Sequence, residues 1–264
     1  MSNEPLLSIQ NVGINFGGLK AVSGFNMEIH QGELVGLIGP NGAGKTTSFN
    51  LLTGVYTPTF GEITFNGKRL NKLAPYQVTK IGISRTFQNI RLFNELSVLD
   101  NVKVAYHSLA KHSIVSSILR LPSHFSGEKE MEEKSIEFLK IFNLHEDLHD
   151  LAKNLPYGKQ RRLEIARALA AGPKLLLLDE PAAGMNPQET QELMSLIAFV
   201  REKFDLTILL IEHDMNLVMG ICERIYVLDH GVLIADGSPD EIRSHPKVIE
   251  AYLGEEVPSA HVHA

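Results

Sequence analysis

A glycine-rich stretch near the start of the chain constrains the fold more than any other feature. It places two glycines five residues apart before a lysine and a threonine, and consists of Gly39, Pro40, Asn41, Gly42, Ala43, Gly44, Lys45, Thr46 and Thr47. This spacing matches the phosphate-binding loop, in which backbone N–H groups close around phosphate oxygens. The apolar residues 33–38 before it and the helical pattern of residues 45–53 after it supply the strand–loop–helix context that such a loop requires. The stretch therefore predicts a nucleotide site rather than an ordinary glycine-rich turn.

The last residues of the loop carry its chemistry. The amino terminus of the following helix offers unpaired N–H groups and a favourable dipole to an anion. We expect Lys45 to reach the β- and γ-phosphates and the hydroxyl of Thr46 to ligate Mg²⁺. A nucleotide with Mg²⁺ is therefore the expected ligand.

The composition narrows the class of protein. The 264 residues are 44% hydrophobic and 21% charged, which is ordinary for a globular protein and excludes a disordered chain. A formal charge of −6 argues against a broad basic surface for nucleic acid, although a local patch stays open. The one cysteine, Cys222, indicates a reducing compartment. Because no apolar run approaches the roughly 18 residues that span a bilayer, we expect a cytosolic protein whose membrane contacts go through a partner.

The first third of the chain predicts antiparallel strands beside a parallel core. Residues 6–12, 25–29 and 61–67 have the alternating pattern of strands, and Asn66-Gly67 is a strong hairpin signal. Phe16 stands alone ahead of the phosphate loop. Its ring either stacks on a nucleotide base or belongs to the core at a strand end.

The middle of the chain predicts a helical insertion. Residues 89–155 are helical in texture, with clear periodicity over 98–105 and 129–142. Between these two runs, residues 112–125 are weakly amphipathic and mildly basic, which favours a peripheral helix over a membrane or partner contact.

Polar residues follow three predicted strands. A strand over residues 81–88 ends at Gln88, the uninterrupted apolar strand 175–178 is followed by Asp179 and Glu180, and the strand 207–211 precedes His213. Ligands of open α/β sheets bind at the carboxyl ends of such strands. Because neighbouring side chains of a strand point in opposite directions, we expect Asp179 to face Mg²⁺ and Glu180 an attacking water. Gln88 either ligates the metal and orients water or faces solvent, and His213 either contacts the γ-phosphate or is structural.

The remaining elements are predicted from local signals. A helix is expected over 159–170, and Asn186-Pro187 followed by Glu189 predicts another helix start. Residues 225–235 are expected to form a hairpin around His230-Gly231, followed by a helix over 239–244.

In order and spacing, these motifs resemble the ATP-binding-cassette ATPases over nearly the whole chain. More narrowly, five segments resemble the ATPase subunits of the high-affinity branched-chain amino-acid importers: residues 85–93, 156–166, 181–187, 211–215 and 248–254. The extended insertion around residues 106–130 is similar too. The resemblance implies an α/β fold with a P-loop NTPase core of RecA-like type. That core comprises residues 1–88 and 156–254 and includes antiparallel strands, while 89–155 form an inserted helical subdomain and 255–264 a flexible tail.

The resemblance also implies a role for each candidate residue. Phe16 matches the aromatic residue that stacks on adenine, and His213 the switch histidine on the γ-phosphate. Gln88 matches the glutamine that touches Mg²⁺ and the water while signalling to the membrane subunit. Asp179 matches the aspartate that orients Mg²⁺, and Glu180 the general base. ATP and Mg²⁺ are the implied cofactors.

Two such subunits close head to tail in this family, so that each ATP lies between one phosphate loop and the signature segment of the partner. The usual signature Leu-Ser-Gly-Gly-Gln is replaced here by residues 155–159, in which Pro156 supplies neither a hydroxyl nor a backbone donor. Contact with the partner's nucleotide then rests on Tyr157, Gly158, Lys159 and the helix amino terminus that follows. Asn186 stands where an aspartate is common. A heterodimer with unequal sites would accommodate these departures, and a homodimer stays open.

The resemblance implies a peripheral ATPase at the cytoplasmic face of the membrane that powers an importer of branched-chain amino acids. Its implied partners are a second ATPase subunit, two integral membrane permease subunits and, indirectly, a substrate-binding protein, with no nucleic acid. Nothing in the chain touches the cargo, so urea, short amides or an exported lipid are alternatives. A soluble ATPase switch is another, although such proteins usually carry two cassettes. A regulatory module without turnover is disfavoured by Glu180 and His213.

Overall fold

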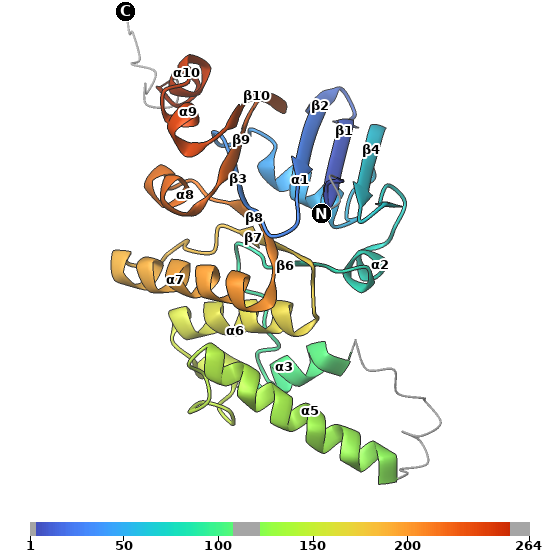
Figure 1. Cartoon of the computed structure of the whole chain (residues 1–264), viewed down its shortest axis with the longest axis vertical. Helices are drawn as coiled ribbons and strands as arrows, with labels where there is room; N and C mark the ends of the chain where they lie inside the picture. The colour runs from blue at the N-terminus through green and yellow to red at the C-terminus, as the bar shows by residue number, and fades with distance from the viewer. Residues whose placement is uncertain (1–3, 108–121, 254–264) are drawn as a thin grey trace, which may run out of the picture.

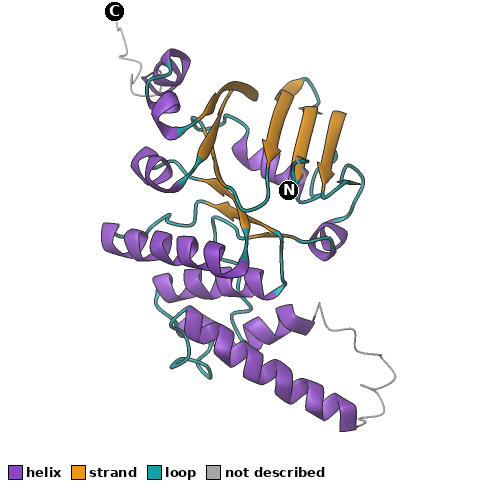
Figure 2. Cartoon of the chain, viewed as in Figure 1, coloured by secondary structure: helices purple, strands orange, loops and turns teal. Residues whose placement is uncertain are grey.

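The computed structural model describes residues 4–107 and 122–253, which form two β-sheets and a group of helices (Figure 1). A small sheet lies beside a larger one at one end of the molecule, and helices cover the larger sheet and continue to the other end (Figure 2). The mixed architecture confirms the predicted α/β class. Residues 108–121, which fall within the predicted insertion, and the predicted tail 255–264 lie outside the described residues.

The smaller sheet is antiparallel and has the strand order β2-β1-β4-β5. Its strands are β1 (Leu7–Phe16), β2 (Leu19–Ile29), β4 (Phe60–Phe65) and β5 (Lys68–Arg69). The predicted hairpin at Asn66-Gly67 is confirmed, since both residues have the positive φ that a type I′ turn requires. β1 and β2 are longer than predicted because shifts in their pairing register interrupt the alternation by which strands are recognised.

The larger sheet has the order β10-β9-β3-β8-β7-β6. Its strands are β3 (Leu34–Ile38), β6 (Ile83–Arg85), β7 (Leu175–Asp179), β8 (Thr207–Ile211), β9 (Arg224–Asp229) and β10 (Val232–Gly237). All pairs are parallel except the β9–β10 hairpin. Every residue of β3, β7 and β8 is buried, which explains their uninterrupted apolar sequences. β6 ends at Arg85, so the prediction of a strand reaching Gln88 is wrong and Gln88 lies in the connection that follows.

Nine α-helices and one short 3₁₀ helix are found in residues 4–107 and 122–253. They are α1 (Lys45–Leu52), α2 (Pro75–Lys80), α3 (Val98–His107), α5 (Pro122–Ile141), η1 (Ala152–Asn154), α6 (Tyr157–Ala170), α7 (Pro187–Phe204), α8 (Met215–Ile221), α9 (Pro239–Arg243) and α10 (Pro246–Leu253). The sequence does not predict α2, α8 or α10, which have 6 to 8 residues and so show little helical periodicity, whereas α1 is recognised at the same length because it follows the phosphate loop.

Alternate residues of the central strands enter two separate cores. Leu176 and Leu178 of β7 pack in one core with residues of α3, α5, α6 and α7. Leu175 and Leu177 pack in the other with α1 and the antiparallel sheet. The two cores hold the central strands from both faces and so fix the positions of their carboxyl ends.

The helical end of the molecule is built on α6. α3 and α5 pack against this helix and against each other (Figure 1). Phe138 and Phe142 of α5 belong to the same core cluster as Leu163 of α6. α6 therefore lies between the larger sheet and the predicted helical insertion. No helix in the described ranges has the length and apolar character that crossing a membrane would need.

Candidate nucleotide site

The phosphate loop connects β3 to α1, and its glycines allow close packing. Gly39 has a φ of 149°, and a Cβ atom there would lie 2.0 Å from the carbonyl oxygen of Leu228 in β9. The N–H of Gly231, in the β9–β10 turn, donates to the carbonyl of Ala43 at 3.0 Å. The loop is thus fixed against the end of the larger sheet. Its last residues begin α1, where backbone N–H groups of a helix can bind an anion.

Lys45 folds back over this loop. Its side chain is buried, and Nζ donates to the carbonyl oxygens of Gly39 at 2.5 Å and Pro40 at 2.8 Å. The ammonium group is therefore held above the loop, where it offsets the charge of a bound phosphate.

A cleft of about 690 Å³ opens in front of the loop. It is lined by residues 41–47 of the loop, together with Phe16, Leu19, Lys20, Ala21, Gln88, Glu180 and His230. Phe16 ends β1 with 44% of its surface exposed and meets Tyr56 edge to face at 5.1 Å between ring centroids. The ring lies in the cleft rather than in the core, which leaves its face available to a planar base.

Asp179 ends β7 and is neutralised by a residue that the sequence analysis missed. Arg85, at the end of β6, donates from Nη2 to Oδ2 of Asp179 at 2.6 Å, and both side chains are 6% exposed. Nη1 of Arg85 donates to Oδ1 of Asn50 in α1 at 2.7 Å. A charged residue inside the predicted strand 81–88 was the available signal. Asp179 is buried and is not among the described residues that line the cleft.

Gln88, Glu180 and His213 come together although they are far apart in the sequence. Nε2 of Gln88 donates to Oε2 of Glu180 at 2.8 Å, and Nδ1 of His213 lies 3.6 Å from the same oxygen. Glu180 has a φ of 44°, and its N–H donates to the carbonyl of Ile211 at 2.9 Å. This backbone conformation is rare for a residue with a side chain. It directs the chain away from β7 just where the carboxylate enters the cleft.

Glu212 is a second residue that the sequence analysis did not single out. The side chain is buried, and burial raises the pKa of its carboxyl group. Oε1 accepts the N–H of Ala182 at 3.0 Å, and Oε2 accepts the N–H of His213 at 3.3 Å. Glu212 therefore ties the segment after Glu180 to the segment that carries His213. A lone acid after an apolar strand gave only a weak signal for this role.

The unusual signature segment begins α6. The hydroxyl of Tyr157 donates to the carbonyl of Ala183 at 2.8 Å, and Nζ of Lys159 pairs with Asp147 at 2.7 Å. Pro156 precedes the helix without a side-chain cap. Among the described residues, the cleft lining includes none of Tyr157, Gly158 and Lys159. Their predicted contact with nucleotide is therefore not made within this single chain.

A glycine loop between a buried parallel strand and a helix, with a lysine over the loop and acidic residues at a second strand end, defines a P-loop nucleotide-binding ATPase. A family model described as "ABC transporter" matches residues 22–183. The chain belongs to this family, as the ATPase of a transporter complex. A second model, "Branched-chain amino acid ATP-binding cassette transporter", matches residues 232–258.

Individual relatives agree with this assignment. The chain is 49% identical to the high-affinity branched-chain amino acid transport ATP-binding protein LivG of Escherichia coli K12, over 96% of this chain and 99% of that protein. It is 45% identical to BraF of Pseudomonas aeruginosa over the same shares. The ADP conformation of MJ1267, an ATP-binding cassette of an ABC transporter, matches with a TM-score of 0.82 at 30% identity, over 96% of this chain and 100% of that one. The predicted family and P-loop NTPase fold are thereby confirmed.

Proposed function

We propose that this ATPase powers the import of branched-chain amino acids. The assignment of the cargo is supported by the names of the relatives at 49% and 45% identity and by the family model that matches residues 232–258. The matched segment contains β10, α9 and α10. The observation that carries the chemistry is the hydrogen bond between Gln88 and Glu180 in the cleft that holds the phosphate loop.

Glu180 acts as the general base in this proposal. Its carboxylate lies in the cleft beside the phosphate loop and is oriented by the amide of Gln88. A carboxylate so placed accepts a proton from water as the water attacks the γ-phosphoryl group in line. Lys45 and His213 offset the negative charge that develops on the transferred group. Phe16 stacks on the adenine ring.

The residues proposed to hold Mg²⁺ suit that ion. Thr46, Gln88 and Asp179 offer hydroxyl, amide and carboxylate oxygens, which are the hard ligands that Mg²⁺ prefers, and few protein ligands are needed when phosphates supply the others. When bound, the ion would neutralise charge on the phosphate oxygens. Arg85 forms an ion pair with the buried Asp179 carboxylate and fixes its position at the end of β7.

The assembly is proposed by analogy with the family. Two ATPase subunits close head to tail, and Tyr157, Gly158 and Lys159 face the nucleotide of the partner. The helical subdomain, residues 89–155, contacts two permease subunits and holds the chain at the cytoplasmic face of the membrane, and a substrate-binding protein delivers the cargo. Residues 1–88 and 156–254 form the core that binds nucleotide.

The proposal is tested with the Glu180→Gln variant in a transporter reconstituted from the chain, its permeases and its binding protein. The variant should bind ATP with unchanged affinity but lose at least about 100-fold in turnover, because the amide cannot accept the proton. Retained hydrolysis would mean that another group is the base. In the wild-type complex, uptake of labelled leucine but not urea is expected. Uptake of urea alone would overturn the cargo assignment and leave the ATPase mechanism standing.

A further inference from the structure

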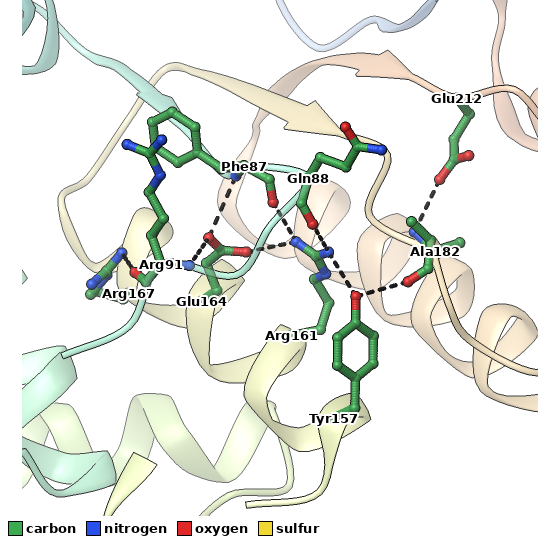
Figure 3. Close-up of polar contacts among 10 residues, drawn as sticks. Phe87, Gln88, Arg91, Tyr157, Arg161, Glu164, Arg167, Ala182 and Glu212 are labelled. Carbon is green, nitrogen blue, oxygen red and sulfur yellow. Dashed lines mark hydrogen bonds and ion pairs between the residues drawn. The ribbon is translucent and has the colours of Figure 1, made fainter. Parts of the chain in front are cut away.

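Two charged side chains of α6 are completely buried against the segment that carries Gln88. Arg161 and Glu164 are 0% and 1% exposed, and Nη1 of the arginine lies 2.8 Å from Oε2 of the glutamate. Figure 3 shows both side chains reaching from α6 to residues 87–91. A buried ion pair of this kind contributes little to stability, because desolvation of the two charges offsets their attraction. Its contacts indicate a different role.

The pair holds the backbone of residues 87–91 by hydrogen bonds. Arg161 donates from Nη1 to the carbonyl of Phe87 and from Nη2 to that of Gln88, each at 2.6 Å. Oε1 of Glu164 accepts the N–H of Arg91 at 3.0 Å and that of Phe87 at 3.4 Å (Figure 3). Four backbone groups are thus held by two rigidly packed side chains. The planar guanidinium fixes the direction of each bond that it donates.

The same arginine is also linked, through Tyr157, to the segment after Glu180. Nη2 of Arg161 donates to the hydroxyl of Tyr157 at 3.2 Å, and this hydroxyl donates to the carbonyl of Ala183 at 2.8 Å. One hydrogen-bonded group therefore joins three parts of the molecule: the start of α6, the backbone at Gln88 and the residues that follow Glu180.

We propose that Arg161 and Glu164 are positioning residues for ATP hydrolysis, which set the meeting of Gln88 with Glu180 according to the position of α6. The inference rests on the proposed function, in which Glu180 is the base. Because α6 begins with the segment proposed to face the partner's nucleotide, a shift of that helix end moves Arg161, and with it the backbone at Gln88. The pair would thereby make hydrolysis at one site depend on the nucleotide held at the other.

The chain offers a matched control on the same helix. Arg162 pairs with Glu192 of α7 at 2.6 Å, but these side chains are 21% and 48% exposed. The test variant is Arg161→Met with Glu164→Leu, which removes both buried charges and keeps apolar bulk in their place. The control variant is Arg162→Met with Glu192→Leu. Both are made in the full chain and assayed in the reconstituted transporter.

Amide hydrogen exchange reports the position of the segment without any need for turnover. In the test variant, the amides of Phe87 and Arg91 should exchange at least about tenfold faster, because their acceptor is gone. The value of kcat should fall about ten- to a hundredfold, as expected when a catalytic group is displaced by around an ångström. The KM for ATP should stay within about twofold, because the phosphate loop is untouched. The control variant should match the wild type in all three.

Adding Gln88→Ala to the test and control variants distinguishes a positioning role of the pair from a merely structural one. If the pair acts through Gln88, this change should lower kcat about tenfold or more in the control variant but less than about twofold in the test variant. The inference would be overturned if the reductions in kcat caused by the test variant and by Gln88→Ala simply multiplied. It would also be overturned if the test variant had the amide exchange and the kcat of the wild type. If the test variant fails to fold, Arg161→Lys keeps the charge but replaces the planar fork by a point charge that does not fix the direction of its bonds, and the same readouts apply. If the wild type and the control variant both lack ATP turnover, the proposed function fails. Amide hydrogen exchange still shows in that case whether Arg161 and Glu164 hold residues 87–91.

Discussion

At the scale of single residues, the site depends on side chains held in costly arrangements. Glu180 adopts a left-handed backbone conformation, which costs a residue with a side chain on the order of 1–3 kcal/mol. Its N–H bond to Ile211 and its contact with Gln88 stabilise that conformation. Glu212 is buried within reach of both Ala182 and His213. Such strain and burial concentrate at the end of β7 and β8, where the proposed chemistry takes place.

Replacing Phe16 by Ala should weaken nucleotide binding by about 1–2 kcal/mol, because the stacking surface at the end of β1 is lost. The Kd for ATP, measured by isothermal titration calorimetry, would rise by about 5- to 30-fold. Phe199→Ala is the matched control, since Phe199 is also half exposed but lies on α7. An unchanged Kd in Phe16→Ala would show that the ring does not contact the base.

The buried carboxyl of Glu212 predicts a specific dependence of stability on pH. Burial raises its folded-state pKa above the ordinary value of 4.5, so the folded state favours the protonated form. The contribution of this group to stability is complete below its unfolded pKa and is lost as the pH rises through the folded pKa. Glu212→Gln cannot ionise. The stability of this variant relative to wild type should therefore increase as the pH rises from 4 to 8. Urea unfolding at each pH measures this difference in the free energy of unfolding. A difference that stays constant over this range would contradict the prediction.

At the scale of elements, the sequence predicts what local patterns encode and misses what depends on distant contacts. β3, β7 and β8 are predicted because complete burial produces unbroken apolar runs. The start of α7 is predicted because Asn186 caps it in a local motif. By contrast, the predicted strand 81–88 is longer than β6, because nothing in the sequence of residues 86–88 shows that pairing with β7 stops at Arg85. Arg85, Arg161 and Glu164 are missed because each owes its role to a partner far along the chain or to complete burial, neither of which a single sequence displays.

The capping motif of α7 gives a prediction at this scale. Oδ1 of Asn186 accepts the N–H of Glu189 at 3.0 Å, and Oε2 of Glu189 accepts the N–H of Asn186 at 3.0 Å. Asn186→Ala should lower the free energy of unfolding by about 1 kcal/mol, because the helix loses its side-chain cap. Gln188→Ala, two residues further along and exposed, should change it by less than about 0.5 kcal/mol. Equal effects of the two changes in denaturant titrations would show that the cap contributes nothing.

At the scale of the whole molecule, the two halves of the proposed nucleotide sandwich lie on different parts of one chain. The phosphate loop opens into the cleft with Phe16 and Glu180. Tyr157 and Lys159, at the start of α6, lie outside the cleft lining and contact Ala183 and Asp147. Lys159 is already paired with Asp147, and Pro156 offers no N–H. A partner nucleotide would therefore meet the N–H groups at the start of α6 and the Tyr157 side chain, rather than the serine hydroxyl that the usual signature supplies. We therefore expect this side of the proposed sandwich to bind the nucleotide less tightly than the side that the phosphate loop provides.

This asymmetry predicts how the subunits associate. If Glu180 is the general base, the Glu180→Gln variant should retain bound ATP. Light scattering with and without Mg·ATP then reports whether two signatures of this type suffice to close a dimer. Because each site of a homodimer would contain the altered signature, we expect the variant to stay monomeric alone and to double in mass only when mixed with a second ATPase subunit. Adding Lys45→Ala serves as the control, since loss of the ammonium over the loop should abolish association under both conditions. ATP-dependent dimers of the variant alone would show that the N–H groups of α6 replace the missing hydroxyl, and would make a homodimeric motor the better description.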